Sequence, residues 1–294
     1  MARVLFLHRL KDSGWAVAWL LLFAVVGVAV TVGLAQVVPG IGGRDWELAR
    51  QAGYQAVGFL VATTVVGRWW NRHRWARMGW RGSWSAPSAW VRGTGIGIAM
   101  AIVAVGLAAL LGGASVHHTP TQGAWLAAVA PVFIGLLLAA LSEELMFRGY
   151  PLRRLADAVT PPAATALLAL GFGLVHVGNP NATVGSTVNV MLAGVFLSLA
   201  FFSRRGMPLA WGLHLGWNAG LALLLDAPVS GYVFHIPGVM YTPGPHPWLD
   251  GGAFGPEGGL VATVTLLAGC AAVLGERLRS PARWWSAEPA REMA

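Results

Sequence analysis

The stretch LSEELMFRGY, residues 141–150, closes an apolar run that begins near Ala124. Two adjacent carboxylates and an arginine therefore stand at the end of a segment long enough to cross a bilayer as a helix. An ionisable side chain inside a membrane costs roughly 2.5–3.5 kcal/mol on insertion scales, so it needs a partner or a function. On a helix, Glu144 and Arg148 are one turn apart and are expected to pair. Glu143 points about 100° away from that pair and has no local partner.

The composition of the whole chain supports the same environment. The 294 residues are 56% hydrophobic and only 11% charged, whereas a soluble domain carries about 25% charged residues. The apolar runs are continuous rather than alternating, which predicts membrane helices rather than a closed barrel. The single cysteine, Cys270, excludes a disulfide framework and a cysteine-based metal site.

The charge pattern predicts the topology. Arginines cluster at the N-terminus and after the second, fourth, sixth and eighth apolar runs, and the remaining connections are poor in arginine. Eight spans with both termini cytoplasmic satisfy the positive-inside rule at every connection. The first run is longer than the roughly 7–15 apolar residues of a signal peptide, so it is interpreted as a retained span. The predicted spans are residues 15–38, 52–67, 93–111, 124–150, 163–177, 187–202, 207–225 and 258–275.

The fold class expected from these patterns is all-α: a polytopic, multi-pass integral membrane protein, which would lie in the cell membrane if the chain is prokaryotic. Short arginine clusters at helix ends indicate contact with the lipid bilayer and not with nucleic acid. The segment 68–92, with six tryptophans and six arginines, and the Trp284-Trp285 pair in the tail are typical of interfacial anchors.

No internal repeat is evident, and we interpret the chain as three regions of one domain. Residues 1–123 hold the first three helices and the Arg/Trp-rich loop. Residues 124–226 hold helices four to seven, which we expect to form the catalytic core. Residues 227–294 hold an extracytoplasmic loop, helix eight and a cytoplasmic tail. Six prolines between 227 and 257 favour a mobile loop, although its His235 and His246 leave a binding role open.

Polar side chains within the apolar runs are few, and they fall in three short motifs. Span four offers Glu143, span five offers His176, and span seven offers His214 and Asn218 at i and i+4. Spans one, two, three, six and eight are nearly bare. Exposing any of these polar side chains to lipid would cost free energy. We therefore expect the three motifs to converge on a shared polar pocket.

Such a pocket has a chemical meaning. A carboxylate beside an imidazole can hold and deprotonate a water, and a second histidine with an asparagine amide supplies donors to a developing oxyanion. Taken singly, the motifs are typical of a structural ion pair, a packing histidine and interhelical hydrogen bonding. Taken together, they favour a catalytic site. If a zinc ion activates the water instead, its ligands are expected to be Glu143, His176 and His214.

The ordered set resembles a known family. Glu143-Glu144-x-x-x-Arg148, Phe172-x-x-x-His176 and His214-x-x-x-Asn218 are similar to the signature motifs of the CPBP family. That family includes the type II CAAX prenyl proteases and the bacteriocin-processing or abortive-infection proteins.

The resemblance implies an eight-helix intramembrane endopeptidase, of glutamate or metalloprotease type, that acts on a membrane-associated or lipidated protein or peptide. It implies that Glu143 and His176 activate the water and that His214 and Asn218 form the oxyanion site. The supporting residues that it implies are Glu144, Arg148 and Phe172.

Two functions other than proteolysis remain open. The first is a transporter or proton relay, because ionisable residues in spans also mark ion paths. The second is a non-catalytic membrane scaffold. No His-Glu-x-x-His motif is present, so a zincin-type site is not expected. Counting along the helices places Glu143 and His176 at unequal depths. They can meet if span four continues toward Asp157 or if span five begins outside the bilayer, and we expect the site to open to the cytoplasmic half.

Overall fold

The computed structural model describes residues 2–38, 40, 43–71, 75–80, 85–120 and 125–279. Each of the eight predicted apolar runs is helical. The predicted Trp284-Trp285 anchor and parts of the Arg/Trp-rich segment lie outside the described residues. The elements are α1 (Ala2–Val37), α2 (Glu47–Asn71), α3 (Ser85–Leu110), β1 (Ser115–His118), α4 (Trp125–Phe147), α5 (Tyr150–Ala158), α6 (Pro161–Val175), α7 (Val184–Phe202), α8 (Gly206–Ala219), β2 (Val239–Thr242), α9 (Pro247–Asp250) and α10 (Leu260–Arg279).

The lengths of these helices bear on the count of membrane crossings. Among the described residues, four segments are long and apolar enough to cross a membrane: Gly14–Val37, Ala86–Leu110, Trp125–Ala158 and Val184–Phe202. Pro161–Val175 and Leu260–Glu276 are apolar but shorter. A helix of 15 residues is only about 22 Å long, against a hydrocarbon core of about 30 Å. The structure is that of an all-α membrane protein, whereas eight crossings and cytoplasmic termini stay predictions.

The fourth span is longer than the apolar run alone. α4 ends at Phe147, the chain turns at Arg148 and Gly149, and α5 continues to Ala158, so that Trp125–Ala158 counts as one candidate span. Helical structure thus continues past Arg148 toward Asp157, as in the first of the two arrangements expected to bring Glu143 and His176 together. The depth of these residues in a bilayer stays a prediction.

α3 and α8 are held together by glycines. Gly93 and Gly97 on α3 face backbone atoms of α8, and Gly212 and Gly216 on α8 face backbone atoms of α3. Small residues four apart let two helices approach until their backbones touch, which is the usual basis of close packing in membranes. This seam fixes α8, which carries two of the predicted site residues.

Gly216→Ala is expected to destabilise the protein by about 1–3 kcal/mol, because the added Cβ would overlap the carbonyl oxygen of Thr94 and a backbone atom cannot rotate away. Thermal unfolding of the purified protein in detergent measures this. The matched control is Gly95→Ala on α3, where a Cβ meets nothing within 4 Å. Equal melting temperatures for both variants would contradict the close packing of α3 against α8 at these glycines.

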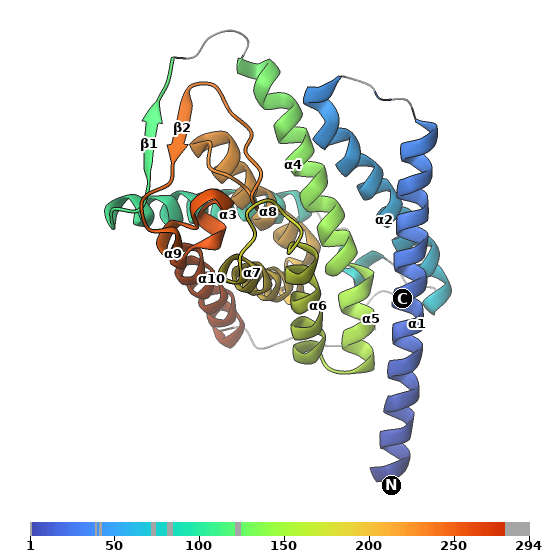
Figure 1. Cartoon of the computed structure of the whole chain (residues 1–294). Helices are drawn as coiled ribbons and strands as arrows, with labels where there is room; N and C mark the ends of the chain where they lie inside the picture. Colours follow the sequence, from blue (N-terminus) through green and yellow to red (C-terminus); the bar gives the residue numbers. More distant parts are fainter. Residues whose placement is uncertain are drawn as a thin grey trace.

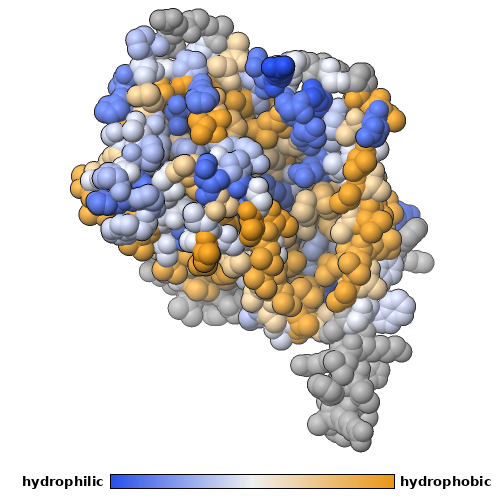
Figure 2. Space-filling view, viewed as in Figure 1, coloured by the Kyte–Doolittle hydropathy of each residue, from blue (hydrophilic) through white to orange (hydrophobic). Residues whose placement is uncertain are grey.

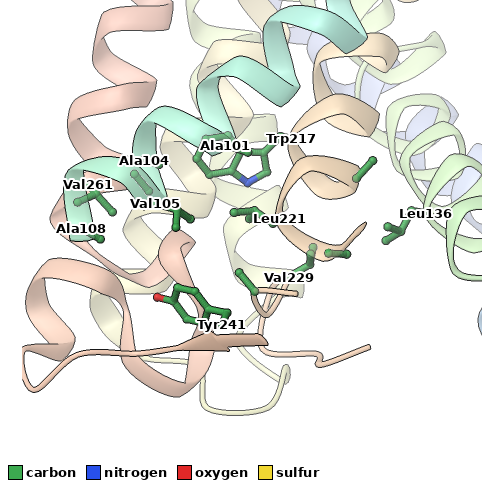
Figure 3. Close-up of a cluster of buried hydrophobic side chains, with 14 of the residues drawn as sticks. Ala101, Ala104, Val105, Ala108, Leu136, Trp217, Leu221, Val229, Tyr241 and Val261 are labelled. Carbon is green, nitrogen blue, oxygen red and sulfur yellow. The ribbon is translucent and has the colours of Figure 1, made fainter. Parts of the chain in front are cut away.

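A buried hydrophobic cluster lies where α3, α8 and α10 meet the segment after α8 (Figure 3). Trp217 of α8 packs there with Leu221, Val229 and Tyr241. The cluster joins residues from all three predicted regions of the chain. The regions therefore share one core.

The proline-rich segment after α8 is not an unstructured loop, and the expectation of a mobile loop is not supported. β2 within it pairs antiparallel with β1, with Ser115 opposite Thr242 and His118 opposite Val239. Asp250 is fully buried and accepts a hydrogen bond from the backbone N–H of Gly252 at 2.9 Å. Neither His235 nor His246 lines the main cavity. The segment instead forms one wall of that cavity.

Candidate active site

Three helices bring the predicted polar residues to one point. Glu143 stands in the last two turns of α4, His176 caps the C-terminus of α6, and His214 lies on α8. Oε2 of Glu143 lies 3.8 Å from Nε2 of His176 and 3.7 Å from Nε2 of His214. The three side chains are thus close enough to share one small ligand.

Hydrogen bonds on the far sides of the two rings fix their orientation. Nδ1 of His176 lies 2.6 Å from the carbonyl oxygen of Phe172, which is one of the unpaired carbonyls at the end of α6. Nδ1 of His214 lies 2.9 Å from Oε1 of Glu144. Both partners can only accept, so each Nδ1 carries the proton. Each ring therefore turns its Nε2 toward Glu143.

The predicted Glu144–Arg148 pair is present and buried. Nη1 of Arg148 donates to Oε1 of Glu144 at 3.1 Å, and the exposed fractions of the two side chains are 1% and 0%. The guanidinium carbon also lies 4.1 Å from the ring centroid of Phe172, a cation–π distance. Glu144 therefore accepts from both Arg148 and His214, which ties the first motif to the third.

Glu143 is left with an unsatisfied oxygen. Its Oε2 is buried and has no hydrogen-bond partner among the described residues. Separations of 3.7–3.8 Å are too long for direct hydrogen bonds. A water between the three atoms can satisfy all of them, as polar groups beyond about 3.5 Å commonly require.

The three residues line a cavity of about 830 Å³. Asn218, one turn after His214 on α8, also lines it and is 8% exposed. Within the described part of the chain no hydrogen bond is recorded for its amide. Its two N–H donors are thus free to meet a ligand. Phe172 lines the cavity as well, between the rings of His176 and Phe147.

The fit to a metal ion is poor in this geometry. Zinc bonds of about 2.0–2.1 Å in a tetrahedron set donor atoms about 3.4 Å apart, closer than the separations around Glu143. Among the described residues no group of three His, Cys, Asp or Glu side chains is arranged to hold a metal.

Polar residues from two further helices also line the cavity. Gln55 and Asn189 lie within the predicted spans 52–67 and 187–202, which were expected to be nearly bare, and Gln51 lies one residue before the first of these spans. The few polar residues of these helices thus belong to the cavity wall. The i, i+4 spacing of Gln51 and Gln55 was the available signal.

Glu257, from the proline-rich segment, also lines the cavity. It accepts from Nε1 of Trp217 at 2.9 Å and from Oγ of Ser230 at 3.1 Å. Asn189 donates to the carbonyl oxygens of Glu257 and Gly259, at 2.9 Å each. These contacts hold the segment against α7 and α8, and no sequence pattern pointed to them.

Comparison with known protein families places a match over the three motifs. Residues 124–220 match the family model described as type II CAAX prenyl endopeptidase Rce1-like. A search of curated proteins gave no match. The matched segment is about one third of the chain, runs from the start of α4 to the end of α8, and contains all three motifs.

Proposed function

We propose that this chain, whose residues 124–220 belong to the CPBP family of type II CAAX prenyl endopeptidases, hydrolyses a peptide bond of a membrane-associated or lipidated protein without a covalent intermediate. The observation that carries the proposal is the buried, unpartnered Oε2 of Glu143, which faces two oriented imidazole nitrogens at 3.7–3.8 Å in the cavity wall. Carboxylate and imidazole at this spacing can hold a nucleophilic water.

Glu143 is the general base in this proposal. Its carboxylate takes a proton from the water as the water oxygen attacks the scissile carbonyl carbon, and Nε2 of His176 accepts the water's other hydrogen and orients it. The carboxylic acid then passes its proton to the leaving amine as the C–N bond breaks. Base and acid are thus the same group, and the site returns to its starting state.

Residues of α8 stabilise the oxyanion in this proposal. The Asn218 amide offers N–H donors toward the cavity, and preorganised donors of this kind stabilise charge that develops in the transition state. Nδ1 of His214 is committed to Glu144, so its Nε2 donates only while the ring carries a second proton. Glu144, neutralised by Arg148, is the positioning residue that holds His214 in place.

A proton relay is the weaker alternative, because the ionisable side chains gather at one point. Oε2 of Glu143 lies within 3.8 Å of both His176 and His214, and Glu144 is held in hydrogen bonds with Arg148 and His214. A relay across the membrane needs ionisable groups along the full depth.

The test is peptide cleavage by the purified protein in detergent, with a panel of fluorogenic membrane peptides. His176→Ala is expected to lower kcat by about 10²–10³-fold, because the water loses its second partner. His117→Ala, on exposed β1 and outside the cavity, is the control and should match the wild type. Wild-type activity in His176→Ala would contradict the proposal.

The same panel with a chelator separates the two water-activating chemistries. A glutamate mechanism predicts unchanged rates. Loss of activity with chelator and its return with added zinc would establish the alternative, with Glu143, His176 and His214 as ligands.

A further inference from the structure

We infer that the cavity takes an extended peptide segment from the arginine-poor, extracytoplasmic face of the protein, along a polar stripe formed by Glu47, Gln51 and Gln55 on α2. The inference rests on the proposed function and names the side from which the substrate comes and the form in which it binds. The stripe lies outside the segment that matches the family model.

The three residues of the stripe share one face of α2. They stand at i, i+4 and i+8, and all three line the cavity. Their neighbours Leu48, Ala49 and Ala52 are apolar. Polar side chains on a membrane helix normally face protein or water because lipid contact is costly. Here they face the cavity, which is the setting expected for ligand-binding groups.

Contacts along the stripe leave donors free near the candidate catalytic residue. Nε2 of Gln51 donates to Oε1 of Glu47 at 2.8 Å. The side-chain amide of Gln55 lies 3.1 Å from Oγ of Ser142, and Ser142 immediately precedes Glu143. The single proton of that hydroxyl also has the carbonyl oxygen of Ala139 within reach, at 2.9 Å. The amide makes no other hydrogen bond among the described residues, and Gln55 is exposed in the cavity. Because an amide has two N–H donors, at least one is available to a substrate carbonyl next to Glu143.

The dimensions of the stripe suit an extended chain. Eight helical residues rise about 12 Å, which three to four residues of extended peptide cover at about 3.3 Å each. Ser230, Tyr232 and Val233 form the opposite wall, fixed by the bond from Asn179 to the carbonyl oxygen of Ser230 at 3.1 Å. A peptide can thus run between α2 and this wall toward Glu143.

The mouth of the cavity lies at one end of the helices. Its lining includes the N-terminal turn of α2, the C-terminal end of α6 and residues 229–234. In Figure 1 the N-terminal ends of α2 and α4 and both strands lie at the top, opposite the chain's N-terminus. Figure 2 shows hydrophilic residues gathered at this upper end, above a hydrophobic band.

The connections at that end carry almost no positive charge. Residues 111–124, 176–183 and 225–259 contain no lysine or arginine, and 38–46 contain only Arg44. The other end carries Arg68, Arg153 and the Arg204-Arg205 pair. Positively charged connections stay in the cytoplasm, so the mouth faces away from it. This reverses the expectation that the site opens to the cytoplasmic half.

Cysteine labelling tests to which side of the membrane the cavity opens, and it does not require catalysis. In a Cys270→Ser background, Gln51→Cys reports the cavity mouth and Arg204→Cys, an exposed position, reports the opposite end. A membrane-impermeant maleimide is added to spheroplasts of an expressing bacterium. We expect Gln51→Cys to label in intact spheroplasts and Arg204→Cys only after permeabilisation. The reverse pattern would overturn the inference and leave the proposed hydrolysis untouched.

Enzyme kinetics test whether the stripe on α2 binds the substrate. With a cleavable peptide long enough to reach α2, Gln55→Leu is expected to raise KM about tenfold with kcat within about twofold, the signature of lost substrate binding. Leucine preserves helix propensity, and melting temperatures check the fold. Thr64→Val, on α2 outside the cavity, is the control. An unchanged KM in Gln55→Leu, or an equal change in Thr64→Val, would overturn the stripe as a binding surface.

Discussion

Replacing Glu143 by glutamine is expected to lower kcat for peptide hydrolysis by about 10³–10⁴-fold with little change in KM. Glutamine keeps the size and shape of the side chain but cannot accept the proton of the water. General base catalysis supplies up to about 10⁴-fold, and a group that acts only in the transition state lowers kcat and kcat/KM equally. Initial rates at saturating peptide, with wild type and variant purified in parallel, measure the effect.

The matched control for Glu143→Gln is Glu276→Gln. Glu276 is a carboxylate on α10 that pairs with Arg205 at 2.6 Å and lies outside the cavity. It should retain the wild-type rate. If Glu143→Gln kept more than about a tenth of the activity, the observed cleavage would not depend on this carboxylate, and the assignment of the site would fail.

Arg148→Leu is expected to destabilise the protein by about 3–5 kcal/mol. Arg148 and Glu144 are both buried, and removing one partner of a buried ion pair leaves the other charge unpaired in a medium of low dielectric. Leucine also loses the contact between the guanidinium and the Phe172 ring. Thermal unfolding in detergent and the monodisperse fraction on size exclusion are the measurements.

A second substitution separates the charge from the packing. Glu144→Gln in the Arg148→Leu background removes the stranded carboxylate, so the double variant should recover part of the stability, as coupled partners do. Activity should not recover, because the neutral amide of Glu144→Gln can accept from Nδ1 of His214 but does not stabilise the second proton that Nε2 needs in order to donate to the oxyanion. A double variant no more stable than Arg148→Leu would contradict the ion-pair explanation.

The sequence by itself determined what depends on local spacing. Runs of apolar residues predicted the helices, because backbone groups in lipid must be satisfied within the segment. The i, i+4 spacing predicted the Glu144–Arg148 pair, and the structure confirms it. The unpartnered Glu143, His176 and His214 predicted a shared pocket, and the structure places each imidazole within 3.8 Å of the Glu143 carboxylate.

Only the tertiary structure decided which faces meet. Periodicity assigns residues to a face of a helix but does not say what that face contacts. The polar face of α2 could have met another helix, yet it lines the cavity beside Glu143. The end of α6 at His176, which frees the Phe172 carbonyl, and the attachment of Glu257 to Trp217 also arise from contacts between distant segments. Such contacts depend on how all helices pack at once, so the direction in which the cavity opens could not be read from spacing along the chain.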